Sequence, residues 1–203
     1  MDAVRVALLR EALAGTELLQ ATRRFAGALR ASVEAHGGGL LLVGTAEYEP
    51  WHLAAHLDDE AAWSGLPELS PTLVRHRVPP GAPAHLSVGL GRLEAARRGE
   101  TLLVVAEGRP GEGLLERVHD ARRGGATVLA LDGAPPAPHS DLRALAHDAL
   151  SVPGAAELGL DTVQHLVSAA AGENGRPAPR GRRFRDRLSR LADQLSAPPP
   201  NRW

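Results

Sequence analysis

The 203-residue sequence contains no cysteine, and this absence excludes several classes of site. Without thiols the chain can form neither a disulfide framework nor a thiolate metal centre, and it has no cysteine nucleophile. Aromatic residues make up only 3% of the sequence, so we expect a core built from leucine, valine and alanine. Such a core suits helices packed on a sheet.

An excess of charge and long apolar runs are also absent. The formal net charge is −1, which gives no general reason to expect nucleic acid or a membrane surface as the main partner. No apolar run approaches the length of a membrane span. The opening residues, MDAVRVALLREALAG, have Arg5 and Arg10 spaced through an apolar pattern and do not resemble a signal peptide, which has a basic start followed by an apolar block. We therefore expect a cytoplasmic protein.

Short apolar runs bounded by glycine, proline or aspartate predict strands at 39–44, 101–106, 126–132 and 149–153. Their apolar residues are continuous, which is typical of a parallel sheet covered on both faces. Residues 72–78 alternate instead and predict a fifth strand, at the edge of the sheet.

Helical patterns precede and separate these strands. Residues 3–35 hold two of them, divided at Gly15 with Thr16 as the predicted N-cap, and the glycines at 37–39 end this region. Further helices are predicted at 49–62, 84–98, 112–123, 140–146 and 159–171. The alternation predicts an α/β fold, a three-layer α/β/α sandwich with a five-stranded parallel sheet. Ligands of such sheets bind where the strand order reverses, here in the loops after residues 44 and 106.

The character of the chain changes after Gly172, so we assign residues 1–172 to one domain and residues 173–203 to a tail. The tail begins as a linker rich in proline, glycine and arginine and ends in a stretch expected to be disordered. Between them, residues 183–195 have the apolar spacing of an amphipathic helix with an arginine-rich outer face. This helix is expected to dock on the domain or on a second subunit. The alternatives are that it binds an acidic partner, nucleic acid or lipid headgroups.

The most informative stretch is ETLLVVAEGRPGEG at 100–113, a strand that leads through a glycine-rich loop into a helix. Backbone amides and a helix N-terminus in this arrangement are typical of anion sites. The loop nevertheless contains Glu107 and no serine or threonine, which disfavours phosphate. Arg109 can pair with Glu107 or bind an anion through two donors.

Two histidines form the clearest candidate metal site. His52 and His56 lie four residues apart on a predicted helix and share a face, and Glu49 or His165 can complete the ligand shell. The alternative is that they are surface or interface histidines. Glu47, Tyr48 and Glu49 follow the first strand and suit a ligand site, whereas in the alternative these acids cap the following helix.

The order of elements resembles the SIS (sugar isomerase) domain, in particular its phosphoheptose isomerase branch. WHLAAHL at 51–57 is similar to the family's QHFAAEL pattern, and GTAEYE at 44–49 looks like the GTNEME loops of small relatives. The run VVAEGRPGEGLLERVHDARRGGATVLALDG at 104–133, with LSVP at 150–153, keeps the family's succession of strand, loop, helix and strands. The resemblance covers residues 3–171 and implies a flavodoxin-like sandwich that assembles as a homodimer or homotetramer.

The same resemblance implies a set of site residues, and many of them depart from the family pattern. The phosphate-binding serines fall on Ala106, Gly108 and Gly111, and the intervening threonine falls on Glu107. The ligand-binding positions implied are Thr45, Glu47, Tyr48, Glu107, Gly108, Arg109 and Gly111.

The family's metal and acid/base residues are also altered. The family histidine falls on His52, its glutamate falls on His56, and His165 lacks the second histidine of the C-terminal helix. The catalytic candidates are therefore Glu49, His52, His56 and His165.

Three functions follow from this reading. The first is an SIS-like protein that binds a phosphorylated sugar or related anionic metabolite without phosphoheptose isomerase activity. The second is a non-catalytic interaction protein that uses residues 183–195. The third is a metal-dependent sugar-phosphate isomerase with a rebuilt site. No cofactor is expected except, in the third case, a divalent metal, and neither nucleic acid nor a membrane is an expected partner.

Overall fold

Five parallel strands form the centre of the protein. The computed structural model describes residues 3–133, 141–152 and 159–173. In this part of the chain the strands pair in the order β2-β1-β3-β4-β5, and every pairing is parallel. The strands are β1 (Leu40–Val43), β2 (Pro71–Val74), β3 (Thr101–Ala106), β4 (Thr127–Asp132) and β5 (Asp148–Ser151). The predicted α/β class, the five-stranded parallel sheet and the edge position of the second strand are confirmed.

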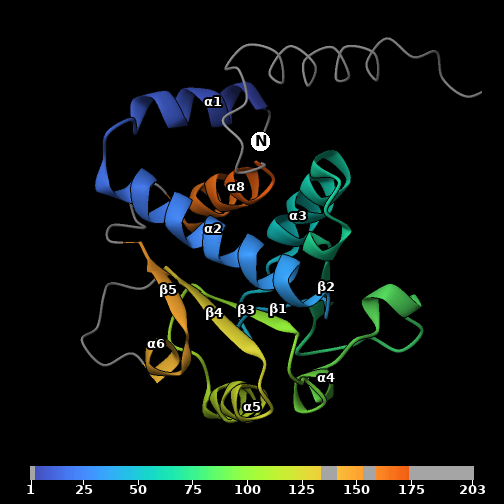
Figure 1. Ribbon diagram of the computed structural model, residues 1–203. Helices are drawn as coiled ribbons and strands as arrows, with labels where there is room; N and C mark the ends of the chain where they lie inside the picture. Colours follow the sequence, from blue (N-terminus) through green and yellow to red (C-terminus); the bar gives the residue numbers. More distant parts are fainter. Residues whose placement is uncertain (1–2, 134–140, 153–158, 174–203) are drawn as a thin grey trace, which may run out of the picture.

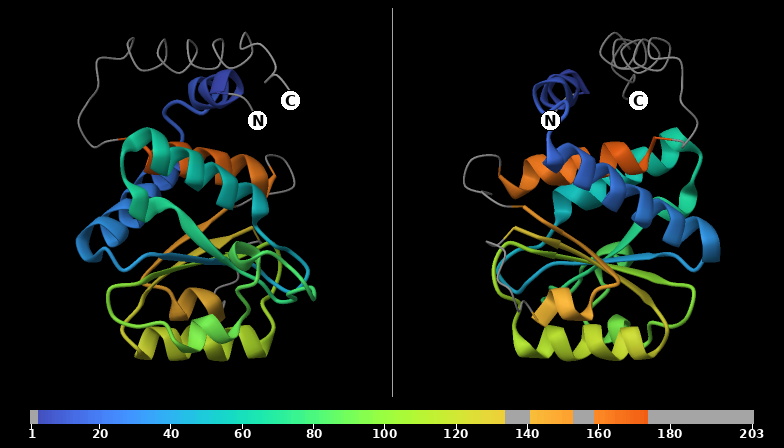
Figure 2. Two further views of the ribbon diagram at one scale, coloured as in Figure 1. Left: turned by 90° about the vertical axis from the view of Figure 1, so that its right-hand side faces the viewer. Right: turned by 60° about the vertical axis from the view of Figure 1, so that its left-hand side comes forward.

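Helices cover both faces of the sheet, which completes the predicted three layers (Figure 1). On one face lie α2 (Glu17–His36), α3 (Trp51–Ser64) and α8 (Leu160–Ala171), with α1 (Ala3–Ala12) outside them. On the other face lie α4 (Gly91–Glu94), α5 (Glu112–Arg123) and α6 (Asp141–Leu145) (Figure 2). Single turns of 3-10 helix, η1 (Pro67–Leu69) and η2 (Ala84–Leu86), complete the described elements. No helix in the described ranges is long and apolar enough to cross a membrane.

The strands are buried on both faces, as their continuous apolar sequences predict. In β3, Leu103 and Val105 belong to the core shared with α2, α3 and α8, whereas Leu102 and Val104 belong to the core shared with α4, α5 and α6. Helix α8 is the most enclosed helix, because nine of its twelve residues are buried. The polar residues on this helix are therefore held in fixed surroundings.

Helix α2 begins and ends where the sequence predicts. The Thr16 hydroxyl accepts a hydrogen bond from the Leu19 backbone N–H at 3.3 Å, which satisfies one of the free donors at the helix start. Gly37 ends the helix in the left-handed conformation, with φ of 60°, and its N–H donates to the Val33 carbonyl. Both predicted caps are confirmed.

The prediction of a continuous helix at 84–98 is wrong. Its place is taken by η2, a short extended segment and the four-residue α4. The Arg75 N–H donates to the Val88 carbonyl at 2.9 Å, and Arg75 forms an isolated parallel bridge with Gly89. This pairing uses backbone groups that a continuous helix would need, and glycine inside a helix costs about 1 kcal/mol relative to alanine. The amphipathic helix predicted at 183–195 lies outside the described residues, as do all residues after 173.

Candidate functional site

Two loops leave the sheet where the strand order reverses. Strand β1 lies between β2 and β3. The chain passes from β1 to β2 on one side of it and then crosses over to form β3 on the other side. In sheets of this order ligands bind beyond the carboxyl ends of the two central strands. The loops concerned are residues 44–50, which lead from β1 to α3, and residues 107–111, which lead from β3 to α5.

The first loop folds back tightly on itself, and Gly44 makes this possible. A Cβ atom at Gly44 would lie 1.8 Å from the Tyr48 carbonyl oxygen and 2.7 Å from Cδ of Pro50, so no larger residue fits. The Tyr48 N–H closes the turn by donating to the Thr45 carbonyl at 3.3 Å. Of the predicted ligand residues in this loop, Thr45 is buried, Glu47 is exposed, and Tyr48 lies at the entrance to α3.

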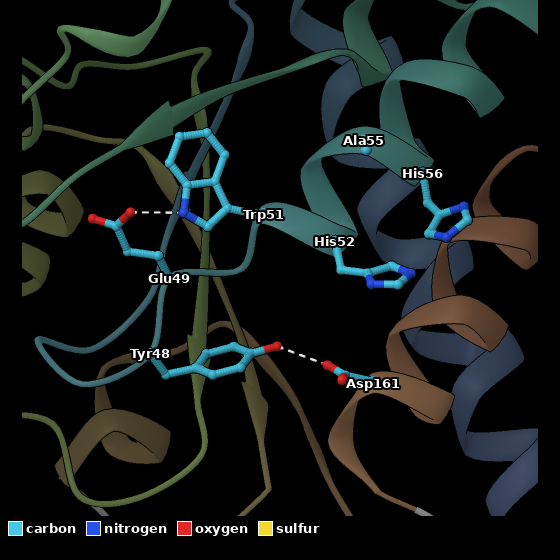
Figure 3. A pocket seen from close by; sticks show the side chains of 7 residues that line it. All are labelled: Tyr48, Glu49, Trp51, His52, Ala55, His56 and Asp161. Carbon is cyan, nitrogen blue, oxygen red and sulfur yellow. Dashed lines mark hydrogen bonds between the residues drawn. The ribbon is translucent and has the colours of Figure 1, made fainter. Parts of the chain in front are cut away.

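Behind this loop lies a pocket of about 440 Å³, within the range of small-molecule sites. Figure 3 shows its lining, in which the β1 loop, α3 and the start of α8 meet. The residues are Tyr48, Glu49, Trp51, His52, Ala55, His56 and Asp161. The structure thus brings Tyr48, Glu49, His52 and His56 together, as the sequence predicts.

The Tyr48 hydroxyl is held by two residues of α8. It donates to Oδ1 of Asp161 at 3.0 Å (Figure 3). It also accepts from Nε2 of the buried Gln164 at 2.7 Å. Burial, aided by the Asp161 and Glu107 carboxylates, raises the pKa of Tyr48 to about 12, although the hydrogen bond from Gln164 opposes this shift. Tyr48 is therefore a protonated donor with a fixed orientation at neutral pH.

Glu49 is held on the opposite wall by a tryptophan and an arginine. The Trp51 indole N–H donates to Oε2 of Glu49 at 2.8 Å, and Nε of Arg75 lies 3.1 Å from the same oxygen. The Arg75 guanidinium also sits 4.7 Å from the centre of the Trp51 ring, which is a cation–π contact. The Trp51 side chain is 40% exposed.

Three histidines meet beside the pocket. His52 and His56 come from α3, and His165 comes from α8, which packs on α3. The ring centres are 4.9 Å apart for His52 and His56, 4.6 Å for His52 and His165, and 4.2 Å for His56 and His165. Burial, followed by the charge of the neighbouring histidines, lowers the pKa of His56 and lowers that of His165 to about 4. His165 is therefore a neutral imidazole at neutral pH.

The glycine-rich loop after β3 does not line this pocket, but the Glu107 carboxylate is near enough to act on Tyr48. A Cβ atom at Gly108 or Gly111 would meet nothing within 4 Å, so these glycines leave open space in front of the loop. Nη2 of Arg109 lies 3.3 Å from Oδ2 of Asp141 at the start of α6, in an exposed ion pair. Of the two roles expected for Arg109, pairing with Glu107 or binding an anion, the first is replaced by this contact.

The sequence analysis does not identify three residues of the site: Asp161, Gln164 and Arg75. Asp161 and Gln164 share one predicted helix with His165, at spacings that place them within a turn of it, and this pattern could have revealed them. The sequence has no comparable signal for Arg75, because its contact with Glu49 joins the end of β2 to a loop 26 residues earlier.

A scan against models of protein families finds no match, and no curated protein matches the sequence significantly. Solved structures do match. A putative sugar-binding protein from Salmonella typhimurium LT2 is 17% identical, aligns with 91% of this chain and has a TM-score of 0.54. The chain spans about half of that protein, 51% of its length.

Two further structures have lower TM-scores. The sugar isomerase domain of an RpiR transcription factor from Sphaerobacter thermophilus is 18% identical, with 83% of this chain and 85% of that chain covered and a TM-score of 0.46. The NanR protein of Vibrio vulnificus, complexed with ManNAc-6P, is 10% identical, with 96% and 75% covered and a TM-score of 0.46. The likeness to the Salmonella protein shows that this chain shares its α/β fold.

Proposed function

We propose that this protein binds a phosphorylated sugar or a related anionic metabolite and has no phosphoheptose isomerase activity. The observation that carries the proposal is the place of the pocket. It opens beyond the carboxyl end of β1, beside the glycine-rich loop of β3, where sheets of this strand order bind their ligands. A protein of the same fold is named for sugar binding, which agrees with this class of ligand.

The pocket itself suits the hydroxyl-bearing part of such a ligand. Asp161 and Glu49 present carboxylate oxygens that accept hydrogen bonds from hydroxyl groups, and Tyr48, which donates its own proton to Asp161, fixes the position of that carboxylate. The exposed Trp51 ring offers an apolar face against which a sugar ring can pack. These groups surround a volume of about 440 Å³, enough for a monosaccharide.

The phosphate is assigned to the loop at 107–111. The glycines leave room for an anion to approach the backbone, and the N-terminus of α5 follows directly. The ion pair of Arg109 with Asp141 is exposed and contributes only about 0–1 kcal/mol, so the guanidinium can exchange this carboxylate for a phosphate. Glu107 repels the anion, which makes Arg109 the deciding side chain.

The absence of isomerase activity is proposed from the state of the candidate bases. Aldose–ketose isomerisation needs a group that moves a proton between neighbouring carbons, and such a base works best with a pKa near the operating pH. His56 stands where the SIS family has its glutamate, and burial lowers its pKa. The pKa of His165 is lowered to about 4, well below the operating pH. Glu49 is already bound to Trp51 and Arg75.

Calorimetric titration and thermal unfolding of the full chain test the binding proposal with three probes: sedoheptulose 7-phosphate, the same sugar without phosphate, and inorganic phosphate. A ligand at one hundred times its Kd stabilises a protein by about 2.7 kcal/mol, which for this size raises Tm by about 5–10 °C. We expect the phosphorylated sugar to bind most tightly. If neither this compound nor other sugar phosphates shift Tm, binding is refuted, and turnover of the 7-phosphate would refute the absence of isomerase activity.

The substitution Arg109→Ala separates the two ends of the ligand. Hydrogen bonds to charged groups contribute about 1.5–3 kcal/mol, so we expect affinity for the sugar phosphate to fall by about 10- to 100-fold. Affinity for the sugar without phosphate should not change. Arg123→Ala, at the exposed far end of α5, is the matched control and should leave both affinities unaltered. Equal losses in the two variants would contradict the assignment of the phosphate to this loop.

The interaction-protein alternative depends on residues 183–195, which lie outside the described residues, and it stays a prediction.

A further inference from the structure

We propose that His52, His56 and His165 bind one divalent transition-metal ion, of the kind typified by zinc, at the inner wall of the pocket. The proposal goes beyond ligand binding and does not depend on the proposed sugar phosphate. It rests on the geometry of the three imidazoles, on the acidic groups around them and on their position beside the pocket.

The three side chains are placed close enough to share one ion. Each offers one ring nitrogen, and these three atoms all lie within 4.8 Å of one another. In a tetrahedral site with Zn–N distances of about 2.0–2.1 Å, neighbouring nitrogens are about 3.3 Å apart. The outermost pair therefore needs to close by less than about 1.5 Å, which rotation of the exposed His52 side chain can supply.

The backbone holds these ligands at the spacing that metal sites use. His52 and His56 are one helical turn apart on α3, so their side chains share a face. His165 projects from α8, which packs directly against α3 and is enclosed on nearly every side. Two rigid helices thus fix the three ligands, and only the outermost has freedom to adjust.

The electrostatics around the histidines favour a cation. Imidazole coordinates a metal through an unprotonated ring nitrogen, and each of the three histidines offers one such nitrogen to the cluster. Asp59 and Asp161 are near enough that their charges act on His56 and His165 respectively. These carboxylates can offset the charge of a bound ion and orient its ligands, as outer-shell acids commonly do.

Three protein ligands leave one position of a tetrahedron open. His52 and His56 line the pocket, so this position faces the space bordered by the Tyr48 hydroxyl and Asp161 (Figure 3). Sites with three protein ligands and an open position are typical of metals that contact a substrate or water, whereas structural zinc sites are closed. The open position would take water or a hydroxyl or carbonyl oxygen of the bound metabolite.

The test uses the full chain after treatment with a chelator, without any sugar present. Zinc is titrated by calorimetry and cobalt(II) by visible absorption, because tetrahedral cobalt(II) gives intense d–d bands. We expect one equivalent of either metal per chain. Loss of an outer-shell partner alone weakens metal sites by about 10- to 100-fold, so His52→Ala should weaken binding at least tenfold. His119→Ala, an exposed helical histidine on α5, should bind as the unaltered chain does.

Because His165 is buried, its variant is made as His165→Asn and its unfolding is measured without metal. If this variant does not fold, His52→Ala and His56→Ala still decide the question, since both residues reach the surface. No saturable binding, or unchanged binding in these variants, would overturn the proposal. Repeating the sugar-phosphate titration on the chelated protein separates the two proposals, because either site can fail while the other binds.

Discussion

Substitution of Tyr48 by phenylalanine removes one oxygen and tests the network that joins the β1 loop to α8. The ring, which packs against the core, stays in place. Asp161 is exposed and regains water, so its lost hydrogen bond costs little. Gln164 is 1% exposed, and its amide N–H then has only the Asp161 carboxylate, 3.4 Å away.

The cost of Tyr48→Phe therefore comes from the buried amide. An unsatisfied buried donor costs about 1–3 kcal/mol, and for a domain of this size each kcal/mol lowers Tm by about 2–4 °C. We expect the free energy of unfolding in urea to fall by about 2 kcal/mol, with an unchanged m-value. Far-ultraviolet circular dichroism should stay the same, since no helix depends on the hydroxyl.

A double-mutant cycle assigns that cost to the pair. In a Gln164→Met background the buried amide is already absent, so Tyr48→Phe should cost less than about 0.5 kcal/mol. If the tyrosine substitution costs the same in both backgrounds, or less than about 0.5 kcal/mol in the unaltered chain, the reasoning is refuted.

Two further predictions concern the loop glycines and the histidines. Gly44→Ala should destabilise the protein by about 3 kcal/mol or more, because its Cβ would lie 1.8 Å from the Tyr48 carbonyl oxygen, while Gly108→Ala should change the free energy of unfolding by less than about 0.5 kcal/mol. Equal urea midpoints for these two variants would contradict this. The pKa of His165 falls from 6.5 to about 4 on folding, so the unfolded chain binds more protons between these values and stability should decrease as pH is lowered through that window. His165→Asn should make stability depend less on pH in this window. An unchanged pH profile in that variant would show that His165 is not the group responsible.

The layers of the fold could be predicted because local sequence determines them. A strand such as β3 is apolar at every position, and only a parallel sheet covered on both faces buries such a run. The segment at 84–98 could not be predicted, because its helical pattern is overridden by a backbone pairing between Arg75 and Gly89. Arg75 and Gly89 come together only once the chain has folded, so no local pattern in the sequence predicts their pairing.

The candidate site was predictable only in part for the same reason. The spacing of His52 and His56 follows from helix periodicity, and so does their shared face. Their meeting with His165 depends on how α8 packs against α3, which no local pattern encodes. Arg109 shows the limit of proximity in sequence, because its nearby acid along the chain is Glu107 but its partner in space is Asp141.

The enclosure of α8 also bears on how the protein is made. This helix supplies Asp161, Gln164 and His165, yet more than a hundred residues separate them from Tyr48 and His52. During synthesis the sheet and the first helices emerge before α8. Until α8 follows, the face of the sheet that it covers stays partly exposed. The pocket can form only when α8 inserts between α2 and α3, so a chain with a complete pocket is one that has finished folding.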